Sequence, residues 1–306
     1  MSLHRLISII MGVPDVAGTT EYYADFGLTR EAGNWFTSQD GGRQLQLVSA
    51  PSRRLLEIRI GVDDADDLGS AASRLRRLGV RYRLTERELT AEEAVTGVRA
   101  VLEVAPRLVQ PEVRPTPYNL PGHTDRAGRA PVLLRDASVR PRKLGHAVVA
   151  TTDFDATTAF FRDGLGFKAS DYIKGEGAFL RCSPEHHNLL VLAFPVVFLH
   201  HTSWQVDDVD EVGRGAFAML EHHPERHVWG LGRHYAGSNF FWYLKDPSGT
   251  FSEYYADMDC IVDDQMWKPE VLEGARGLFS WGPPPPPSFL RPDDLAALMT
   301  GSHSAR

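Results

Sequence analysis

The sequence predicts an α+β protein built from four βαβββ modules, arranged as two similar barrel-like domains. Three observations support this prediction. Two segments of the first half recur in the second half, hydrophobic periods near 3.6 and 2 alternate along the chain, and 306 residues are enough for two domains of about 100–200 residues each. A hydrophobic content of 42% is ordinary for a globular chain and argues against disorder.

The internal repeat is visible in two separate matches. Residues 14–25 match residues 152–163 at an offset of 138 (153 − 15), with aspartates, a threonine pair and an aromatic pair coinciding. Further along, Val62–Gly69 matches Val206–Gly213 at an offset of 144 (206 − 62). Because both matches occur in the same order at nearly equal offsets, we interpret residues 1–105 and 142–256 as diverged copies of one structural unit.

The elements of the second half follow the βαβββ order twice. We expect a strand at Leu144–Ala150, a helix at Asp153–Gly164, strands at Ala178–Arg181 and Asn188–Ala193, a strand at Leu199–Val206, a helix at Asp208–Leu220, and strands at Phe240–Lys245 and Phe251–Tyr255. An aspartate stands at the start of each helical stretch. Aspartate is a good N-cap residue, so these positions mark the helix starts.

Two segments are rich in proline: the one that links the two halves and the one at the end of the chain. Residues 106–141 hold seven prolines and little periodicity, so we expect a connector, with a strand around Pro131–Leu134. We therefore place an N-terminal metal-free domain at 1–135, a C-terminal catalytic domain at 136–270 and a proline-rich tail at 271–306.

Within the tail, five consecutive prolines favour an extended polyproline II segment at Pro283–Pro287. We interpret this segment as a rigid wrap over the domain. A short helix is expected at Pro292–Met299, followed by a frayed end at Gly301–Arg306.

Charge and composition exclude several classes of partner. The formal charge is −7 and no long basic run occurs, so neither a nucleic acid nor an anionic membrane is expected as a partner. The longest apolar run, Leu189–Leu199, is too short to span a bilayer as a helix. We read no secretion signal at the N-terminus, and the two cysteines do not form a disulfide framework. We expect a cytoplasmic protein that forms a homo-oligomer.

Histidines cluster in the second half, at positions where strand side chains can point into a barrel. Two of them, His146 and His201, together with Glu253, lie on three different predicted strands. The corresponding residues of the first half are Ser8, Glu57 and Val101. Because the first half folds without the His/His/Glu set, a functional role for this set is favoured over a role in folding.

Two imidazoles and a carboxylate on separate strands are the donor set of a facial triad. Such a triad suits Fe(II), with Mn(II) a close substitute, and leaves about three positions of an octahedron open for other ligands. A closed structural zinc site would need four ligands, usually including cysteine, and the sequence has no CxxC pair.

Four segments carry a resemblance to a known family: Lys143–Val148, Glu185–Leu190, Phe198–Trp204 and Gly232–Glu253, the last with the spacings His-x8-Tyr and Tyr-x9-Glu around Asp-Pro-Ser-Gly. The sequence resembles the type I extradiol dioxygenases, the ring-cleaving branch of the vicinal oxygen chelate superfamily, which includes catechol 2,3-dioxygenases and dihydroxybiphenyl dioxygenases. The resemblance covers nearly the whole chain, because that family also has a metal-free first half.

The resemblance implies a role for six residues. The metal ligands fall on His146, His201 and Glu253, the active-site acid/base on His187, the substrate-contacting histidine on His234 and the hydrogen-bonding tyrosine on Tyr243. The implied reaction inserts both atoms of O2 into a catechol-type diol and opens the ring beside the diol. Titration near neutral pH makes a histidine such as His187 a suitable proton shuttle.

Two other functions stay open at this point. One is a metal-dependent isomerase or epimerase on the same scaffold, which would usually need a fourth protein ligand. The other is a non-catalytic protein that binds an aromatic compound. The residues that would select the substrate are not determined by the sequence; the candidates are Phe179, Phe194, Phe198, Trp204, Phe279–Trp281, Arg233 and Arg291. For Trp204 we favour packing in the core.

Overall fold

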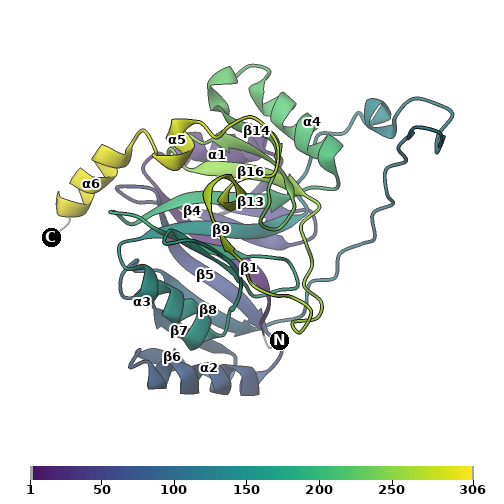
Figure 1. The fold of residues 1–306 in the computed structure, drawn as a ribbon. Helices are drawn as coiled ribbons and strands as arrows, with labels where there is room; N and C mark the ends of the chain where they lie inside the picture. Colours follow the sequence, from purple (N-terminus) through teal and green to yellow (C-terminus); the bar gives the residue numbers. More distant parts are fainter. Residues whose placement is uncertain (1–2, 305–306) are drawn as a thin grey trace.

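A computed structural model describes residues 3–304 of the chain (Figure 1). The first half forms an eight-stranded sheet with two helices, in the order β1 (Leu3–Val13), α1 (Val16–Asp25), β2 (Thr29–Glu31), β3 (Trp35–Ser38), β4 (Gly42–Ser49), β5 (Arg54–Val62), α2 (Ala65–Arg77), β6 (Tyr82–Leu84), β7 (Glu88–Glu92) and β8 (Arg99–Val104). This order is βαβββ, twice.

The second half repeats the plan in a nine-stranded sheet. Its elements are β9 (Lys143–Thr151), α3 (Phe154–Ala159), the π-helical turn η2 (Phe160–Leu165), β10 (Lys168–Ile173), β11 (Gly177–Arg181), β12 (Leu189–Ala193), β13 (Phe198–Gln205), α4 (Val209–Leu220), the 3₁₀ turn η3 (Pro224–Arg226), β14 (His227–Arg233), β15 (Phe240–Lys245), β16 (Phe251–Ala256) and β17 (Val271–Leu272). The predicted α+β class and the four modules are confirmed. The strands β10 and β14 were not foreseen.

The two sheets are connected in the same way. The first has the order β2-β3-β4-β1-β5-β8-β7-β6 and the second β14-β15-β16-β13-β9-β12-β11-β10-β17. In each sheet the two modules meet where their first strands pair antiparallel, β1 with β5 and β9 with β13. Within each module the first strand pairs parallel with the last. At the centre of the second sheet, these pairings place β16, β13 and β9 side by side.

Aspartates cap the four module helices, as expected. The N-cap residues are Asp15, Asp64, Asp153 and Asp208, and each side chain accepts a hydrogen bond from the amide three residues further on. After the first helix of each half the chain turns through a glycine with positive φ, Gly27 at 95° and Gly166 at 99°. These are the Gly-apolar pairs that end the first sequence match, and only glycine adopts this backbone without strain.

The two halves share one continuous hydrophobic core. Phe26, at the end of α1, stacks on Tyr254 of β16 with ring centroids 3.9 Å apart. At the other end of the interface Arg74 of α2 donates to the carbonyl oxygens of Gly164 and Leu165, at 3.1 and 2.8 Å. A shared core of this kind holds the second sheet rigidly on the first.

The connector runs as an extended arm away from the body, at the right of Figure 1. The strand predicted around Pro131–Leu134 is wrong, because these residues form the 3₁₀ turn η1. Proline fixes φ near −65° at the first position of such a turn, and Leu133 N–H closes it by donating to the Ala130 carbonyl at 3.0 Å.

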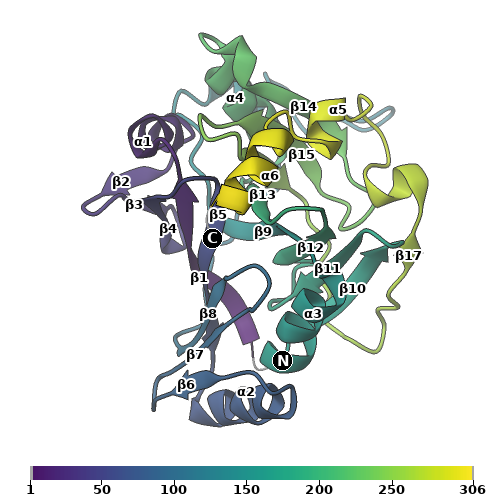
Figure 2. The ribbon, with the colours of Figure 1, turned by 90° about the vertical axis from the view of Figure 1, so that its left-hand side faces the viewer.

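The tail folds back over the second sheet, and Figure 2 shows α6 in front of β13 and α5 beside β14. It contains η4 (Gly274–Gly277), α5 (Pro287–Leu290) and α6 (Leu295–Ser304). Pro286 has the φ of −67° and ψ of 151° typical of polyproline II. The predicted helix at Pro292–Met299 exists but begins at Leu295, and it continues to Ser304 through part of the predicted frayed end; residues 305–306 lie outside the described residues.

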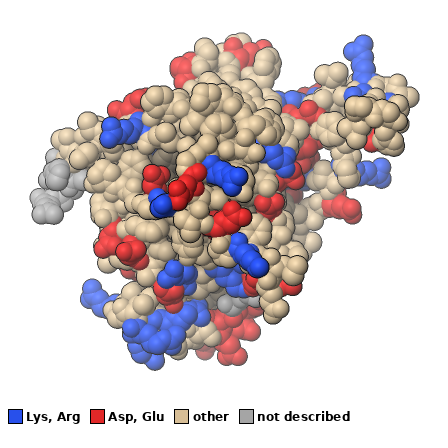
Figure 3. Space-filling view, in the orientation of Figure 1, with Lys and Arg blue, Asp and Glu red and all other residues tan. Residues whose placement is uncertain are grey.

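On the face shown in Figure 3, acidic and basic side chains are interspersed. The basic atoms at its lower edge lie over α2, where Arg74, Arg76 and Arg77 form the last turn. Among residues 3–304, no helix combines the length and the apolar character needed to cross a bilayer.

Candidate metal centre and substrate cavity

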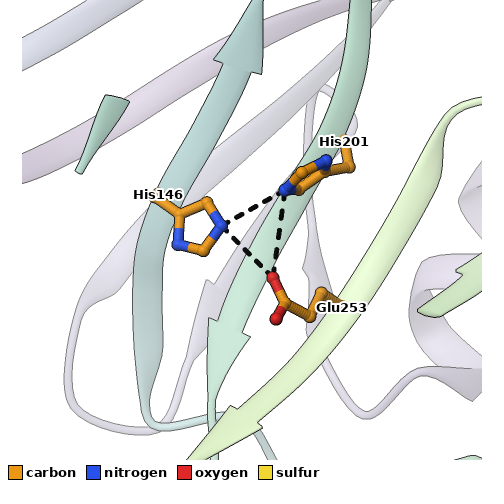
Figure 4. A group of neighbouring side chains, drawn as sticks. All are labelled: His146, His201 and Glu253. Atoms are coloured by element: carbon orange, nitrogen blue, oxygen red, sulfur yellow. Dashed lines mark hydrogen bonds and ion pairs between the residues drawn. The ribbon is translucent and has the colours of Figure 1, made fainter. Parts of the chain in front are cut away.

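Three adjacent strands of the second sheet bring His146, His201 and Glu253 together (Figure 4). His146 lies on β9, His201 on β13 and Glu253 on β16. Ser203 of β13 pairs with His146 on one side and with Glu253 on the other. Because strand side chains alternate between faces, His201, two residues before Ser203, points to the same face as its neighbours.

The distances within this group suit a single metal ion. The His146 Nε2 atom lies 3.2 Å from His201 Nε2 and 3.2 Å from Glu253 Oε2, and His201 Nε2 lies 3.9 Å from Glu253 Oε2. Neighbouring ligands of an octahedral ion with bonds of about 2.1 Å are separated by roughly 3 Å. All three side chains are buried, so the donor atoms face one another and not the solvent.

The hydrogen bonds around the site leave one potential metal-ligand atom of Glu253 and one of His201 free for an ion. Glu253 Oε1 accepts from Asn239 Nδ2 at 3.1 Å, whereas Oε2 is buried without a partner. His201 Nδ1 lies 2.8 Å from His200 Nδ1, and His200 Nε2 lies 2.9 Å from the carbonyl oxygen of Phe289. A carbonyl only accepts, so neutral His200 carries its proton on Nε2 and accepts from His201 Nδ1–H, which leaves the lone pair of His201 on Nε2.

The protonation states also suit a cation. Burial, followed by the nearby imidazoles of His200 and His146, holds the pKa of His201 well below its usual value. Burial alone would raise the pKa of Glu253, but its interactions with His146 and His234 outweigh burial and lower that pKa. His201 is therefore a neutral imidazole and Glu253 an ionised carboxylate, the forms in which these groups bind a metal ion.

A cavity of about 610 Å³ opens beside the triad. Most of its lining is apolar and comes from β10–β12 and the tail; the lining includes Ile173, Phe179, Leu190, Leu192, Phe194, Pro195, Ala236, Leu278, Phe289, Leu290 and Leu295. Glu176 and Arg291 are its charged lining residues outside the triad. The volume lies within the range of small-molecule sites.

His187 lines this cavity directly beside the triad. Its ring centroid lies 4.2 Å from that of His146 and 5.0 Å from that of Phe179. Its Nδ1 atom lies 3.0 Å from His186 Nδ1. Burial, followed by the charges of the surrounding histidines, holds the pKa of His187 well below its usual value, so the imidazole is neutral and able to accept a proton.

His234 and Tyr243 form a hydrogen-bonded pair on the opposite side of the cavity. The Tyr243 hydroxyl lies 2.9 Å from His234 Nε2, and His234 Nδ1 donates to the carbonyl oxygen of Leu278. Since the Nδ1 proton is used in that bond, neutral His234 accepts from the tyrosine through Nε2. Burial, followed by the charge of Glu253, raises the pKa of Tyr243 well above its usual value, so the phenol keeps its proton.

All six residues singled out from the sequence thus line one cavity or its metal centre. Sequence reasoning missed His200, Asn239 and the carbonyl groups of Leu278 and Phe289. His200 could have been noticed as the first member of a His-His pair. The two carbonyls have no side-chain signal at all.

Only some of the residues proposed to select the substrate line the cavity. Phe179, Phe194 and Arg291 line the cavity, whereas Arg233 pairs instead with Asp257 at 2.7 Å. Trp204 is buried in the core and donates to Thr202, in agreement with the packing role we favoured. Phe198 also packs behind the site, against Phe194 and the guanidinium of Arg53.

The comparison with known proteins first identifies the class. Residues 143–254 match the family model described as "Glyoxalase/Bleomycin resistance protein/Dioxygenase superfamily". The structure superposes on an extradiol ring-cleaving dioxygenase from B. fuscum with a TM-score of 0.73, covering 94% of this chain and 81% of that one at 19% identity. The protein therefore has the glyoxalase, or vicinal oxygen chelate, fold.

Curated relatives narrow the class to one branch. Metapyrocatechase 2 of Cupriavidus necator is 38% identical over 155 residues, which are 50% of this chain and 48% of that protein. The chain thus spans about half the length of the first curated relatives it matches. A biphenyl-2,3-diol 1,2-dioxygenase of Pseudomonas sp. (strain KKS102) aligns over 305 residues, 90% of this chain and all of that one, at 29% identity. These relatives confirm the resemblance to the extradiol dioxygenases.

Proposed function

We propose that this protein is an extradiol dioxygenase that cleaves a catechol-type aromatic diol next to its two hydroxyl groups, in the breakdown of aromatic compounds. The observation that carries the proposal is the triad of His146, His201 and Glu253, with ligand atoms 3.2–3.9 Å apart at the wall of an apolar cavity. Its residues fit a divalent ion, and relatives of this chain are named iron-dependent and manganese-dependent. We propose Fe(II) as the ion, with Mn(II) as a substitute.

A bound Fe(II) ion would supply the place where diol and O2 are held side by side and exchange electrons. The remaining work belongs to the protein. Glu253 contributes one negative charge, so a diol that binds as a monoanion balances a divalent ion. The buried walls exclude water and hold the ring in one orientation. Holding the reactants close together in this way lowers the activation barrier.

Proton transfer falls to His187. Its imidazole is neutral and lies beside His146, so it can accept the proton that the diol loses and return it later in the reaction. Tyr243 keeps its phenolic proton and can donate a hydrogen bond to negative charge that develops on the substrate. His234 holds Tyr243 in place, and it can donate to a deprotonated hydroxyl only when Nε2 is also protonated.

The cavity favours an apolar substrate larger than a single ring. Its volume of about 610 Å³ exceeds what one catechol ring fills, and its lining is mainly aliphatic and aromatic. The one arginine of the lining, Arg291, shares the cavity with Glu176, so a carboxylated ring meets no concentrated positive charge.

The decisive experiment starts with the metal-free protein under anaerobic conditions. It is loaded with Fe(II) or, in parallel, Mn(II), mixed with a panel of monocyclic and bicyclic diols, and then exposed to air. We expect one O2 consumed per diol and a yellow ring-opened product. An isomerase or epimerase would convert its substrate without consuming O2, and a binding protein would change nothing but the free ligand concentration; either result contradicts the proposal. The cytoplasmic location and the homo-oligomeric state stay predictions.

A further inference from the structure

A buried chain of hydrogen bonds runs from the proposed acid/base away from the metal centre. His187 Nδ1 lies 3.0 Å from His186 Nδ1, and His186 Nε2 lies 2.9 Å from Asp171 Oδ2. All three side chains are buried, and His186 is completely so. These hydrogen bonds connect β10, which carries Asp171, with the loop before β12, which carries both histidines.

The acceptor at the end of the chain fixes the positions of the protons. An ionised carboxylate only accepts, so His186 Nε2 carries a proton and donates to Asp171. Neutral His186 then has its lone pair on Nδ1 and accepts from His187 Nδ1–H. His187 is left with a lone pair on Nε2, the nitrogen with no hydrogen-bond partner among the described residues, on the ring that lines the cavity.

We propose that Asp171 and His186 are positioning residues that hold His187 in the tautomer with a free Nε2 lone pair. This inference rests on the proposed function, because it gives His187 the part of the base that accepts the proton of the diol. When His187 receives that proton, the buried carboxylate of Asp171 stabilises the resulting positive charge through His186. The arrangement has the same logic as the carboxylate–histidine pair of serine hydrolases.

The surroundings of Asp171 support a role beyond packing. Its other oxygen, Oδ1, accepts from the Glu270 amide at 2.7 Å, and its ion-pair partner in the described part of the chain is His186. A buried carboxylate without an arginine or lysine partner is costly to a fold unless it is used. His186 packs against Phe179 in a tilted arrangement and against Trp267 in an edge-to-face one, with ring centroids 5.6 and 5.4 Å away, and these contacts restrict its orientation.

Replacing Asp171 by asparagine tests the inference without changing the size of the side chain. The amide oxygen will accept from Glu270 N–H, so the NH₂ group faces His186 Nε2 and demands a lone pair there. His186 then donates from Nδ1, and His187 is forced into the opposite tautomer, protonated on Nε2. We expect kcat to fall about 100- to 10,000-fold with little change in KM.

A spectroscopic measurement separates this effect from a loss of fold. In the metal-free protein, ¹⁵N NMR of the imidazoles should show His187 protonated on Nδ1 in the wild type and on Nε2 in the Asp171→Asn variant. Iron affinity should not change, because no atom of the triad contacts Asp171. An unchanged tautomer, or an unchanged kcat, would overturn the inference.

Two further variants complete the design. Asp259→Asn is the matched control, because the Asp259 side chain accepts from Ser238 at 2.8 Å and has no hydrogen bond to the His186 ring, while the Asp259 carbonyl, which accepts from the His186 backbone N–H at 2.8 Å, is kept in the variant. We expect its kcat to stay within twofold of the wild type. His186→Phe removes the middle of the chain; Asp171→Asn added to it should cause no further loss of kcat, since residues that act as one unit are not additive. Additive losses would contradict the proposal.

The NMR arm also keeps this inference separate from the proposed function. If the wild-type protein cleaves no diol, the proposed function fails, and the tautomer of His187 in the metal-free protein still decides whether Asp171 and His186 set it. If the wild type cleaves diols while the Asp171→Asn variant matches it in kcat and in tautomer, the inference alone fails.

Discussion

The two halves of the molecule place different chemistry at the same point of the same scaffold. In the second half, His146, Ser203 and Glu253 lie side by side on three strands. In the first half, the residues in the same register are Ser8, Arg59 and Val101. Glu57, two residues before Arg59, takes the place of His201.

Both halves bury a carboxylate there and differ in the cation that balances it. Arg59 donates to Glu57 at 2.7 Å, and Arg99 pairs with the other oxygen of Glu57. Arg59 also reaches Glu88 and Glu103, both at 2.9 Å. Neither oxygen of Glu57 is left for a metal.

In the second half the arginine is replaced by Ser203, a small side chain whose hydroxyl is buried without a partner. Among residues 3–304, no guanidinium forms an ion pair with Glu253, and Glu253 Oε2 has no hydrogen-bond partner. The comparison teaches that one scaffold can balance a buried carboxylate with a protein cation or leave that place to a metal ion.

The largest difference between the two halves is expected when a residue of the proposed metal centre is replaced. His146→Ala or Glu253→Gln should abolish iron binding and lower the rate of diol cleavage at least about 1,000-fold, because the ion supplies several kcal/mol of stabilisation. Ser8→Ala, at the position that corresponds to His146, should leave both within twofold. Iron content and O2 uptake are the measurements. Full turnover in either ligand variant would contradict the assignment of the triad.

Acid should destabilise the second half through His200. Burial, opposed in part by the bond to the Phe289 carbonyl, lowers the pKa of His200 to about 4 from a usual value near 6.5. Below pH 6.5 the unfolded chain therefore binds more protons at this residue than the folded chain. Its contribution to stability is present above pH 6.5 and is lost as the pH falls to about 4, a change of about 3 kcal/mol.

Urea unfolding of the metal-free protein at pH 7 and pH 4.5 measures this loss. The His200→Phe variant should lose less stability between the two pH values than the wild type. Equal losses would show that His200 already takes up its proton in the folded state. The position that corresponds to His200 in the first half is Leu56, which does not titrate.

The smallest effect is expected in the first half. Glu57→Gln removes the charge that balances Arg59 and should lower the free energy of unfolding by about 1–3 kcal/mol, since Glu57 is buried but its arginine partners are partly exposed. Iron content should not change. Loss of iron in this variant would show that the first half takes part in metal binding.

Most of this architecture could be predicted from the sequence, because a repeat shows itself in matched residues. The N-cap aspartates and the turn glycines are such residues, and they gave the four modules. The strands β10 and β14 escaped notice because they are irregular; β14 contains two glycines, and its pairing with β15 has two register shifts. The 3₁₀ turn at Pro131–Leu134 looked like a strand because a short apolar run has no period of its own.

The site also contains residues that could be predicted from the sequence and residues that could not. His146, His201 and Glu253 were found because metal chemistry restricts the residue types at these positions. The contacts that orient His200 and His234 were not found, since Phe289 and Leu278 act through carbonyl groups that every residue has. Asp171 and His186 have informative side chains, but only the folded sheet brings Asp171 within 2.9 Å of the His186 ring.

The bond between His200 and Phe289 has a consequence for the order in which the molecule matures. The two residues are 89 positions apart in the chain. At about 5–20 residues added per second, a ribosome reaches Phe289 roughly 4–18 s after His200. Throughout that interval the nascent second half holds His200 without the carbonyl group that fixes its tautomer, so the hydrogen bonds behind His201 are completed only when this late stretch of the polypeptide has been made.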